Sequence, residues 1–130
     1  MQLSEREVDL GMVQKHLTFA QIGCGYWGPN LLRNLVANKD CSVKTVVDLS
    51  KDRRGFVKSL YPAIHVTDNV QEVFNDHSID AVIIATPVAT HFDLVTQSLE
   101  SQKHVLVEKP MASSVAEVEH IGGIAKQKNL

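Results

Sequence analysis

Short apolar runs typical of β-strands alternate with segments of helical spacing along most of this chain. The runs that predict strands cover residues 17–22, 43–47, 63–66, 81–85 and 104–107. Helices are predicted after each of them, over residues 31–36, 50–60, 69–74, 90–99 and 114–124. Because parallel strands need helical crossovers between them, this alternation predicts an α/β domain with a doubly wound parallel sheet.

Polar residues stand where these helices are expected to begin. Ser50 can cap the second helix, which Pro62 ends. At three further starts a polar residue is followed three positions later by an acid, which is the spacing of a capping box. These pairs are Asn69 with Glu72, Thr90 with Asp93, and Ser114 with Glu117.

The composition is that of a single globular domain without a strongly charged partner. Of the 130 residues, 44% are hydrophobic, and the net charge of −2 gives no electrostatic reason to expect nucleic acid or an anionic membrane. No apolar run approaches the roughly 18 residues that span a bilayer, and the first residues have no hydrophobic signal region. Cys24, Cys41 and the six histidines show no metal-binding or redox spacing. We therefore expect free thiols, a cytoplasmic protein and no metal site.

Three glycines follow the first predicted strand in the pattern Gly-x-Gly-x-x-Gly. Gly23 permits a tight turn, Gly25 lets a pyrophosphate approach the backbone, and Gly28 lets the next helix pack closely. The free N–H groups and the dipole at the start of that helix favour an anion. The pattern therefore predicts a Rossmann dinucleotide site, with Tyr26 and Trp27 inside the turn counted among its residues. A tight turn without a ligand is the alternative.

An acidic residue ends the second predicted strand. Asp48 lies 20 residues beyond Gly28, close to the offset expected for the acid that binds the ribose hydroxyls of the adenosine. Its carboxylate would repel the 2′-phosphate of NADP, which favours NAD, and Leu49 beside it is no phosphate donor. Arg53 and Arg54 lie nearby and could still hold that phosphate, so NADP stays possible. A helix-capping aspartate is the alternative reading of Asp48.

Polar residues also follow the fourth and fifth predicted strands, at the sheet edge where ligands of such folds bind. After the fourth strand, Thr86, Pro87 and His91 can line the cofactor, although a capped loop explains them equally well. After the fifth strand, Lys109 can orient the reacting hydroxyl of a substrate, and Glu108 can fix Lys109 by charge pairing. Solvated strand ends are the alternative for this pair.

Together these motifs resemble the Gfo/Idh/MocA oxidoreductase family over about residues 17–130. Members of that family use NAD or NADP to oxidise or reduce sugars, inositols and sugar nucleotides. The resemblance implies that Lys109 is the active-site lysine and that Glu108 lies on the cofactor side. The sequence of the turn is most similar to members that act as sugar-nucleotide dehydrogenases. The motifs that carry the resemblance are Gly-Cys-Gly-Tyr-Trp-Gly-Pro-Asn, Val46-Val47-Asp48, Ala85-Thr86-Pro87 with Thr90-His91, and Glu108-Lys109-Pro110.

The family resemblance also implies a division into domains. Residues 1–16 are expected to be an N-terminal extension and residues 17–130 a truncated Rossmann domain, without the final strand and the C-terminal substrate domain of the family. Such a chain is expected to bind cofactor without turnover, because nothing shields the reacting centre from water. The full-length protein is expected to be a homo-oligomer. A stand-alone nucleotide-binding module without catalysis remains the alternative.

Overall fold

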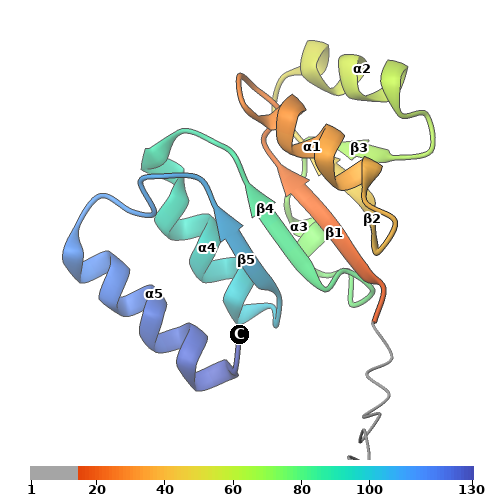
Figure 1. The fold of residues 1–130 in the computed structure, drawn as a ribbon. Helices are drawn as coiled ribbons and strands as arrows, with labels where there is room; N and C mark the ends of the chain where they lie inside the picture. Colours follow the sequence, from red (N-terminus) through yellow and green to blue (C-terminus); the bar gives the residue numbers. More distant parts are fainter. Residues whose placement is uncertain (1–14) are drawn as a thin grey trace, which may run out of the picture.

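The computed structural model describes residues 15–130, in which five strands form one parallel sheet (Figure 1). Of the predicted N-terminal extension, only residues 15 and 16 lie within this range. The strands are β1 (Leu17–Ile22), β2 (Cys41–Val47), β3 (His65–Thr67), β4 (Ala81–Ile84) and β5 (His104–Val107). Their order, β3-β2-β1-β4-β5, reverses direction between β1 and β4. The doubly wound parallel sheet predicted from the sequence is therefore confirmed.

Helices cover both faces of this sheet. The helices are α1 (Gly28–Ala37), α2 (Lys51–Leu60), α3 (Gln71–Phe74), α4 (His91–Glu100) and α5 (Val115–Lys128), with a 3-10 turn η1 (Val88–Thr90). Neighbouring residues of β2 belong to different apolar clusters: Val46 packs with Leu32 of α1 and Val57 of α2, whereas Val47 packs with residues of α3, α4 and α5. The period of two along the strand thus places α1 and α2 on one face and the other helices on the opposite face.

Two strands begin at a different residue from the prediction. Strand β3 begins at His65 rather than at residue 63, because the Ile64 N–H donates to the Tyr61 carbonyl oxygen (3.0 Å) and closes a turn there. Strand β2 begins at Cys41, two residues earlier than predicted, and pairs along all of β1. Neither shift changes which residues lie at the carboxyl ends of the strands.

The predicted helix caps are correct in two of four places. Ser50 Oγ accepts from the Arg53 N–H (3.3 Å), and Ser114 Oγ accepts from the Glu117 N–H (3.2 Å). At Asn69 only half of the predicted capping box forms. Asn69 Oδ1 accepts from the Gln71 N–H (3.1 Å), but the Glu72 carboxylate binds side chains of β3 instead of returning to the helix start.

Thr90 also does not cap α4 through its side chain. Its hydroxyl oxygen lies 2.7 Å from both Thr86 Oγ1 and the Pro87 carbonyl oxygen, so it closes the turn that precedes α4. This contact holds the loop after β4 in a compact form.

Charged side chains join the loops at the amino ends of the strands. Lys15 pairs with Asp80 (2.8 Å) and Lys44 pairs with Asp76. Between these pairs Lys103 is 1% exposed, and its ammonium donates to the carbonyl oxygens of Asp76 (2.8 Å) and Ile79 (3.0 Å). Burial lowers the pKa of Lys103. Three ammonium groups thus add to the backbone hydrogen bonds at this end of the sheet.

None of the helices within residues 15–130 is long and apolar enough to cross a membrane.

Candidate cofactor site at the carboxyl edge of the sheet

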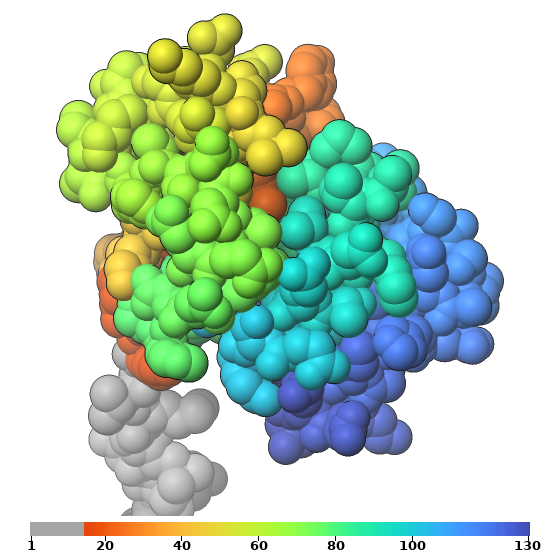
Figure 2. All heavy atoms as spheres, turned by 180° about the vertical axis from the view of Figure 1, so that it is seen from behind, coloured from red at the N-terminus to blue at the C-terminus, as the bar shows by residue number. Residues whose placement is uncertain are grey.

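The carboxyl ends of the central strands meet at a cavity of about 720 Å³, a volume typical of small-molecule sites. Backbone hydrogen bonds of 2.8 Å join Gly23 to Val47 and Ala85 to Ile22 across these ends. Seen from behind, the cavity opens between the yellow-green residues around α2 and β3 and the teal residues before α4 (Figure 2). The lining residues are Ile22, Gly23, Gly25, Val47, Asp48, Leu49, Ser50, Arg53, Asp68, Val70, Ala85, Thr86, Pro87, Ala89, Thr90, Asp93 and Leu94.

The three glycines of the turn meet three different steric demands. Gly23 has a φ of 92°, and a Cβ atom there would lie 2.5 Å from the Ala85 carbonyl oxygen. A Cβ atom on Gly28 would lie 2.7 Å from the Gly23 carbonyl oxygen, so the helix start packs directly on the turn. Gly25 faces open space and lines the cavity. Tight turn, close packing and open approach are thus distributed over the glycines as the sequence predicts.

Gln21 supports this turn from inside the sheet, and sequence reasoning missed it. Its side chain is fully buried, and its amide nitrogen donates to the carbonyl oxygens of Gly23 (3.0 Å) and Gly28 (2.8 Å). The only signal in the sequence is a polar residue in an apolar strand two positions before the first glycine. The amide fixes the two ends of the turn relative to each other.

The start of α1 can receive an anion. Its N-cap residue, Trp27, provides no side-chain cap, and the first turn holds no acidic residue. Pro29 occupies the first turn, as predicted, where a missing N–H costs nothing. The backbone N–H groups of residues 25–28 donate to no other residue in the described part of the chain. Unpaired N–H groups at a helix N-terminus are a phosphate site.

Asp48 faces the same cavity from the end of β2. One carboxylate oxygen accepts from the Cys24 N–H (2.8 Å) and the other from the Ser50 N–H (2.8 Å). The alternative reading of Asp48 as a helix cap is wrong, because Ser50 caps α2. Each carboxylate oxygen can accept a second hydrogen bond, so Asp48 retains capacity for ribose hydroxyls.

Cys24, inside the turn, is an uncharged thiol. Burial, reinforced by the Asp48 carboxylate, raises the pKa of Cys24 to about 11. The side chain packs in the apolar cluster between the sheet, α1 and α2. Cys24 is therefore a core residue, and the free thiols expected from the sequence are present in Cys24 and Cys41.

The two arginines after β2 have different surroundings. Arg54 donates to the backbone carbonyl oxygens of Asp48 (2.7 Å) and Leu49 (2.9 Å), so it holds the loop. Arg53 lines the cavity together with Leu49 and with Asp68 from the loop after β3. Arg53 is thus the cation of this pair that a cofactor would meet.

The predicted residues after β4 and β5 divide between the cavity and its rim. Thr86 and Pro87 line the cavity, whereas Glu108 and Lys109 do not. The Glu108 N–H donates to the Ile84 carbonyl oxygen (3.0 Å) and so ends the ladder between β4 and β5. The predicted charge pair is wrong: within residues 15–130, Glu108 and Lys109 form no ion pair. Lys109 is exposed beside this strand end.

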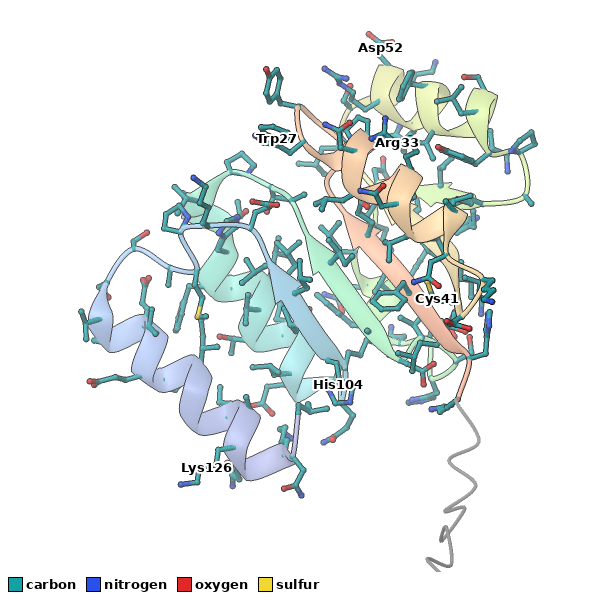
Figure 3. All side chains as sticks on the ribbon, viewed as in Figure 1. Trp27, Arg33, Cys41, Asp52, His104 and Lys126 are labelled. Carbon is teal, nitrogen blue, oxygen red and sulfur yellow. The ribbon has the colours of Figure 1, made fainter. Side chains whose placement is uncertain are left out.

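Tyr26 and Trp27 lie on the outer side of the turn. They are 87% and 60% exposed, and their rings meet edge to face with centroids 5.5 Å apart. Trp27 lies at the carboxyl edge of the sheet, at the opposite end from His104 (Figure 3). Like Gly28, the two aromatic residues do not line the cavity, whereas Gly23 and Gly25 do.

His91 does not line the cavity, although it is among the residues that the sequence predicts to line the cofactor. Its side chain is 1% exposed, and both ring nitrogens already face backbone carbonyl oxygens. The ring is therefore not available to a ligand in the cavity, and His91 is not one of the residues that line it.

Metal binding has no candidate in the described residues: no group of three or more His, Cys, Asp or Glu side chains within residues 15–130 is placed to hold an ion.

Comparison with known proteins identifies the family to which this site belongs. The model of the GFO_IDH_MocA family, described as an oxidoreductase family with an NAD-binding Rossmann fold, matches residues 17–130. The chain belongs to this family. It is an NAD(P)-binding oxidoreductase domain, and the resemblance inferred from the sequence is confirmed.

Named relatives include oxidoreductases and dehydrogenases. The uncharacterized oxidoreductase YdgJ of Escherichia coli is 32% identical over 81% of this chain and 30% of its own length. The scyllo-inositol 2-dehydrogenase (NADP(+)) IolU of Bacillus subtilis is 32% identical over 85% of this chain and 34% of its own length. The chain therefore spans about a third of the length of these relatives.

Solved structures share the same fold. An NAD-binding protein from Listeria innocua matches with a TM-score of 0.82 and 28% identity, over 88% of this chain and 34% of that one. GenD2 from gentamicin A biosynthesis, solved in complex with NAD, matches with a TM-score of 0.85 and 26% identity, over 89% of this chain and 33% of that one.

Proposed function

We propose that this chain binds NAD as the cofactor domain of a dehydrogenase that acts on a sugar or sugar nucleotide. The observation that carries the proposal is the glycine turn: its backbone N–H groups at residues 25–28 are unpaired among the described residues, and its Gly25 lines the same cavity as Asp48. The turn would hold the pyrophosphate, and Asp48 would accept from the adenosine ribose hydroxyls. The open space at Gly25 and the absence of an acid in the first turn of α1 fit such a ligand.

The preference for NAD over NADP rests on charge. Asp48 would repel a 2′-phosphate. The Asp68 carboxylate on the same wall lies 3.9 Å from Arg54 Nη2 and is partly compensated by it, and Arg54 also donates to backbone oxygens. Arg53 is the other nearby cation, and it lines the cavity. GenD2 was solved with NAD, and IolU is named for NADP(+). The preference for the cofactor without the extra phosphate therefore rests on the Asp48 carboxylate, which forms no ion pair among the described residues.

Titration calorimetry with NAD and NADP tests this assignment. NAD is expected to bind more tightly than NADP to the wild-type chain. Asp48→Ala should weaken NAD binding at least about tenfold, since a hydrogen bond to a charged group contributes about 1.5–3 kcal/mol. Asp48→Asn keeps the shape and removes the charge, so it should shift the preference toward NADP. Asp52→Asn is the matched control, because Asp52 projects from α2 away from the cavity (Figure 3). Tighter binding of NADP to the wild type would refute the assignment.

We further propose that Lys109 acts at the reacting oxygen of the substrate. When bound, the cofactor supplies or accepts a hydride at its nicotinamide ring. Lys109 is exposed at the end of β5, next to the strand whose end lines the cavity. Its ammonium would donate a hydrogen bond or a proton to the substrate oxygen, while Thr86 and Pro87 form the wall beside it.

Measurement of kcat in a protein as long as the relatives, with this chain as its cofactor domain, tests this role. Lys109→Ala should lower kcat far more than it weakens cofactor binding, and an unchanged kcat would remove Lys109 from the reaction. The 130-residue chain, about a third of the relatives' length, is expected to bind cofactor and to show no turnover with sugar nucleotides. Turnover by this chain would refute the second expectation.

A further inference from the structure

One buried imidazole joins the loop after β4 to the loop after β5. His91, the first residue of α4, places Nε2 2.8 Å from the Thr86 carbonyl oxygen and Nδ1 2.7 Å from the Pro110 carbonyl oxygen. These partners are 5 and 19 residues away along the chain. With 1% of its surface exposed, the ring meets protein on all sides.

Both ring nitrogens face acceptors that have no hydrogen to give. A neutral imidazole carries one N–H and can donate to only one of the two carbonyl oxygens, whereas the imidazolium donates to both. In either form the ring donates at least one bond between the loops. An apolar side chain at this position would leave two carbonyl oxygens without this donor in a buried place, which is costly.

His91 links the loop after β4 to the loop after β5, beyond the point at which the two strands stop pairing. The ladder between β4 and β5 ends with the hydrogen bond from the Glu108 N–H to the Ile84 carbonyl oxygen. Beyond that bond, one loop carries Thr86 along the cavity wall and the other carries Lys109 and Pro110. The imidazole spans the two loops at this level, so the position of Lys109 relative to the cavity depends on it.

We propose that His91 is a positioning residue that sets where Lys109 lies relative to the bound cofactor. This inference rests on the proposed function, in which the cofactor occupies the cavity and Lys109 acts beside it. His91 acts through Pro110 and touches neither ligand. The two ring nitrogens have separate tasks: Nδ1 faces the loop that carries Lys109, and Nε2 faces the loop that carries Thr86. The ring donates to one of these loops when it is neutral and to both when it is protonated.

Two amide substitutions separate these tasks. An asparagine amide reaches about as far as Nδ1, and a glutamine amide about as far as Nε2. His91→Asn should therefore keep the contact with Pro110 and loosen Thr86, while His91→Gln should do the reverse. His104→Asn and His104→Gln are matched controls, because His104 is exposed at the other end of the sheet (Figure 3).

The first readout is backbone amide hydrogen exchange in the absence of cofactor. His91→Gln should accelerate exchange in residues 109–112, and His91→Asn should accelerate it in residues 86–90, with β1 and β2 unchanged in both. A purely structural role would raise exchange throughout the domain in both variants, and that result would overturn the proposal. This readout does not depend on NAD.

The second readout is protection of Lys109 by NAD against an amine-reactive reagent, measured by mass spectrometry at saturating NAD. Wild type and His91→Asn should show protection, and His91→Gln should lose it while still binding NAD. Retained protection in His91→Gln would overturn the positioning role. Absence of NAD binding in the wild type would instead refute the proposed function, and NAD binding without protection of Lys109 would refute the assigned place of Lys109.

If both variants fail to fold, NMR of the wild-type chain decides. The buried ring should give a slowly exchanging N–H signal with cross-relaxation to the protons of Pro110 or Thr86. A ring N–H that exchanges rapidly with water would overturn the proposal.

Discussion

The amide of Gln21 makes a clear energetic prediction at the scale of single residues. Gln21→Met has a similar size and removes the donor shared by the Gly23 and Gly28 carbonyl oxygens. It also removes Oε1, a buried acceptor without a partner among residues 15–130, which offsets part of the loss. The net loss of unfolding free energy should be about 1–2 kcal/mol, measured by urea denaturation. Gln127→Met, on the exposed side of α5, is the control; an equal effect of both substitutions would contradict this role of Gln21.

Prediction from the sequence succeeds for residues whose role depends on spacing and fails for those that act through space. The glycines and Asp48 stand at fixed offsets from strand ends, so their places in the cavity follow from the pattern. Gln21 and His91 instead bind backbone carbonyl oxygens of loops, and no spacing along the chain announces such contacts. For this reason Gln21 was missed and His91 was assigned to the ligand rather than to the loops that hold it.

At the scale of elements, one substitution made at two glycines separates a required glycine from a tolerated one. Gly23→Ala places a Cβ atom 2.5 Å from the Ala85 carbonyl oxygen at a φ of 92°, which costs at least about 1–2 kcal/mol. Gly55→Ala lies inside α2 with open space around it, so it should stabilise the protein by up to about 1 kcal/mol. Thermal unfolding followed by circular dichroism measures both. If Gly23→Ala were neutral, the strand–turn–helix unit would not need its tight turn.

Elements with strong periodicity are predicted well, and the short ones are not. The nearly continuous apolar run of β4 identifies a central strand, and all four of its residues are buried. The three-residue β3 and four-residue α3 carry too few residues for a periodic signal. There, Glu72 binds Thr67 and His65 of the strand instead of capping its own helix, because the tertiary contact replaces the local one.

At the scale of the whole molecule, acid should weaken the ion pair at the end of the sheet opposite the cavity. Lys44 and Ser78 bind the Asp76 carboxylate at the end opposite the cavity and lower its pKa from 3.8 to about 2. A carboxyl group whose pKa is lower in the folded than in the unfolded state stabilises the protein at pH values above its unfolded pKa. This stabilisation is lost as the pH falls through the folded pKa. Between pH 3.8 and about 2, the unfolding free energy of Asp76→Asn should therefore fall less steeply than that of the wild type.

Urea denaturation at several pH values measures this difference. Asp52→Asn is the control, because the Asp52 carboxylate pairs with no cation among the described residues. Since the Lys44–Asp76 pair is partly exposed, salt should reduce the effect. Parallel curves for wild type and Asp76→Asn at low salt would show that this ion pair does not contribute to acid unfolding.

The fold and the family of the molecule follow from its sequence, and its substrate does not. Alternating strands and helices with one glycine turn predict the doubly wound parallel sheet and the edge of the sheet at which the cavity lies. The residues that would select a sugar do not follow from this sequence. The chain spans about a third of the relatives' length, and in our proposal the cofactor fills its cavity.

Trp27, exposed at the rim of the glycine turn, is the only tryptophan in the chain. All indole emission of this protein therefore comes from the segment that we expect a dinucleotide to touch. The emission band of an indole overlaps the absorption band of reduced nicotinamide but not that of the oxidised ring. The protein thus carries its own optical probe, which distinguishes arrival of the reduced cofactor from arrival of the oxidised one without any substrate or label.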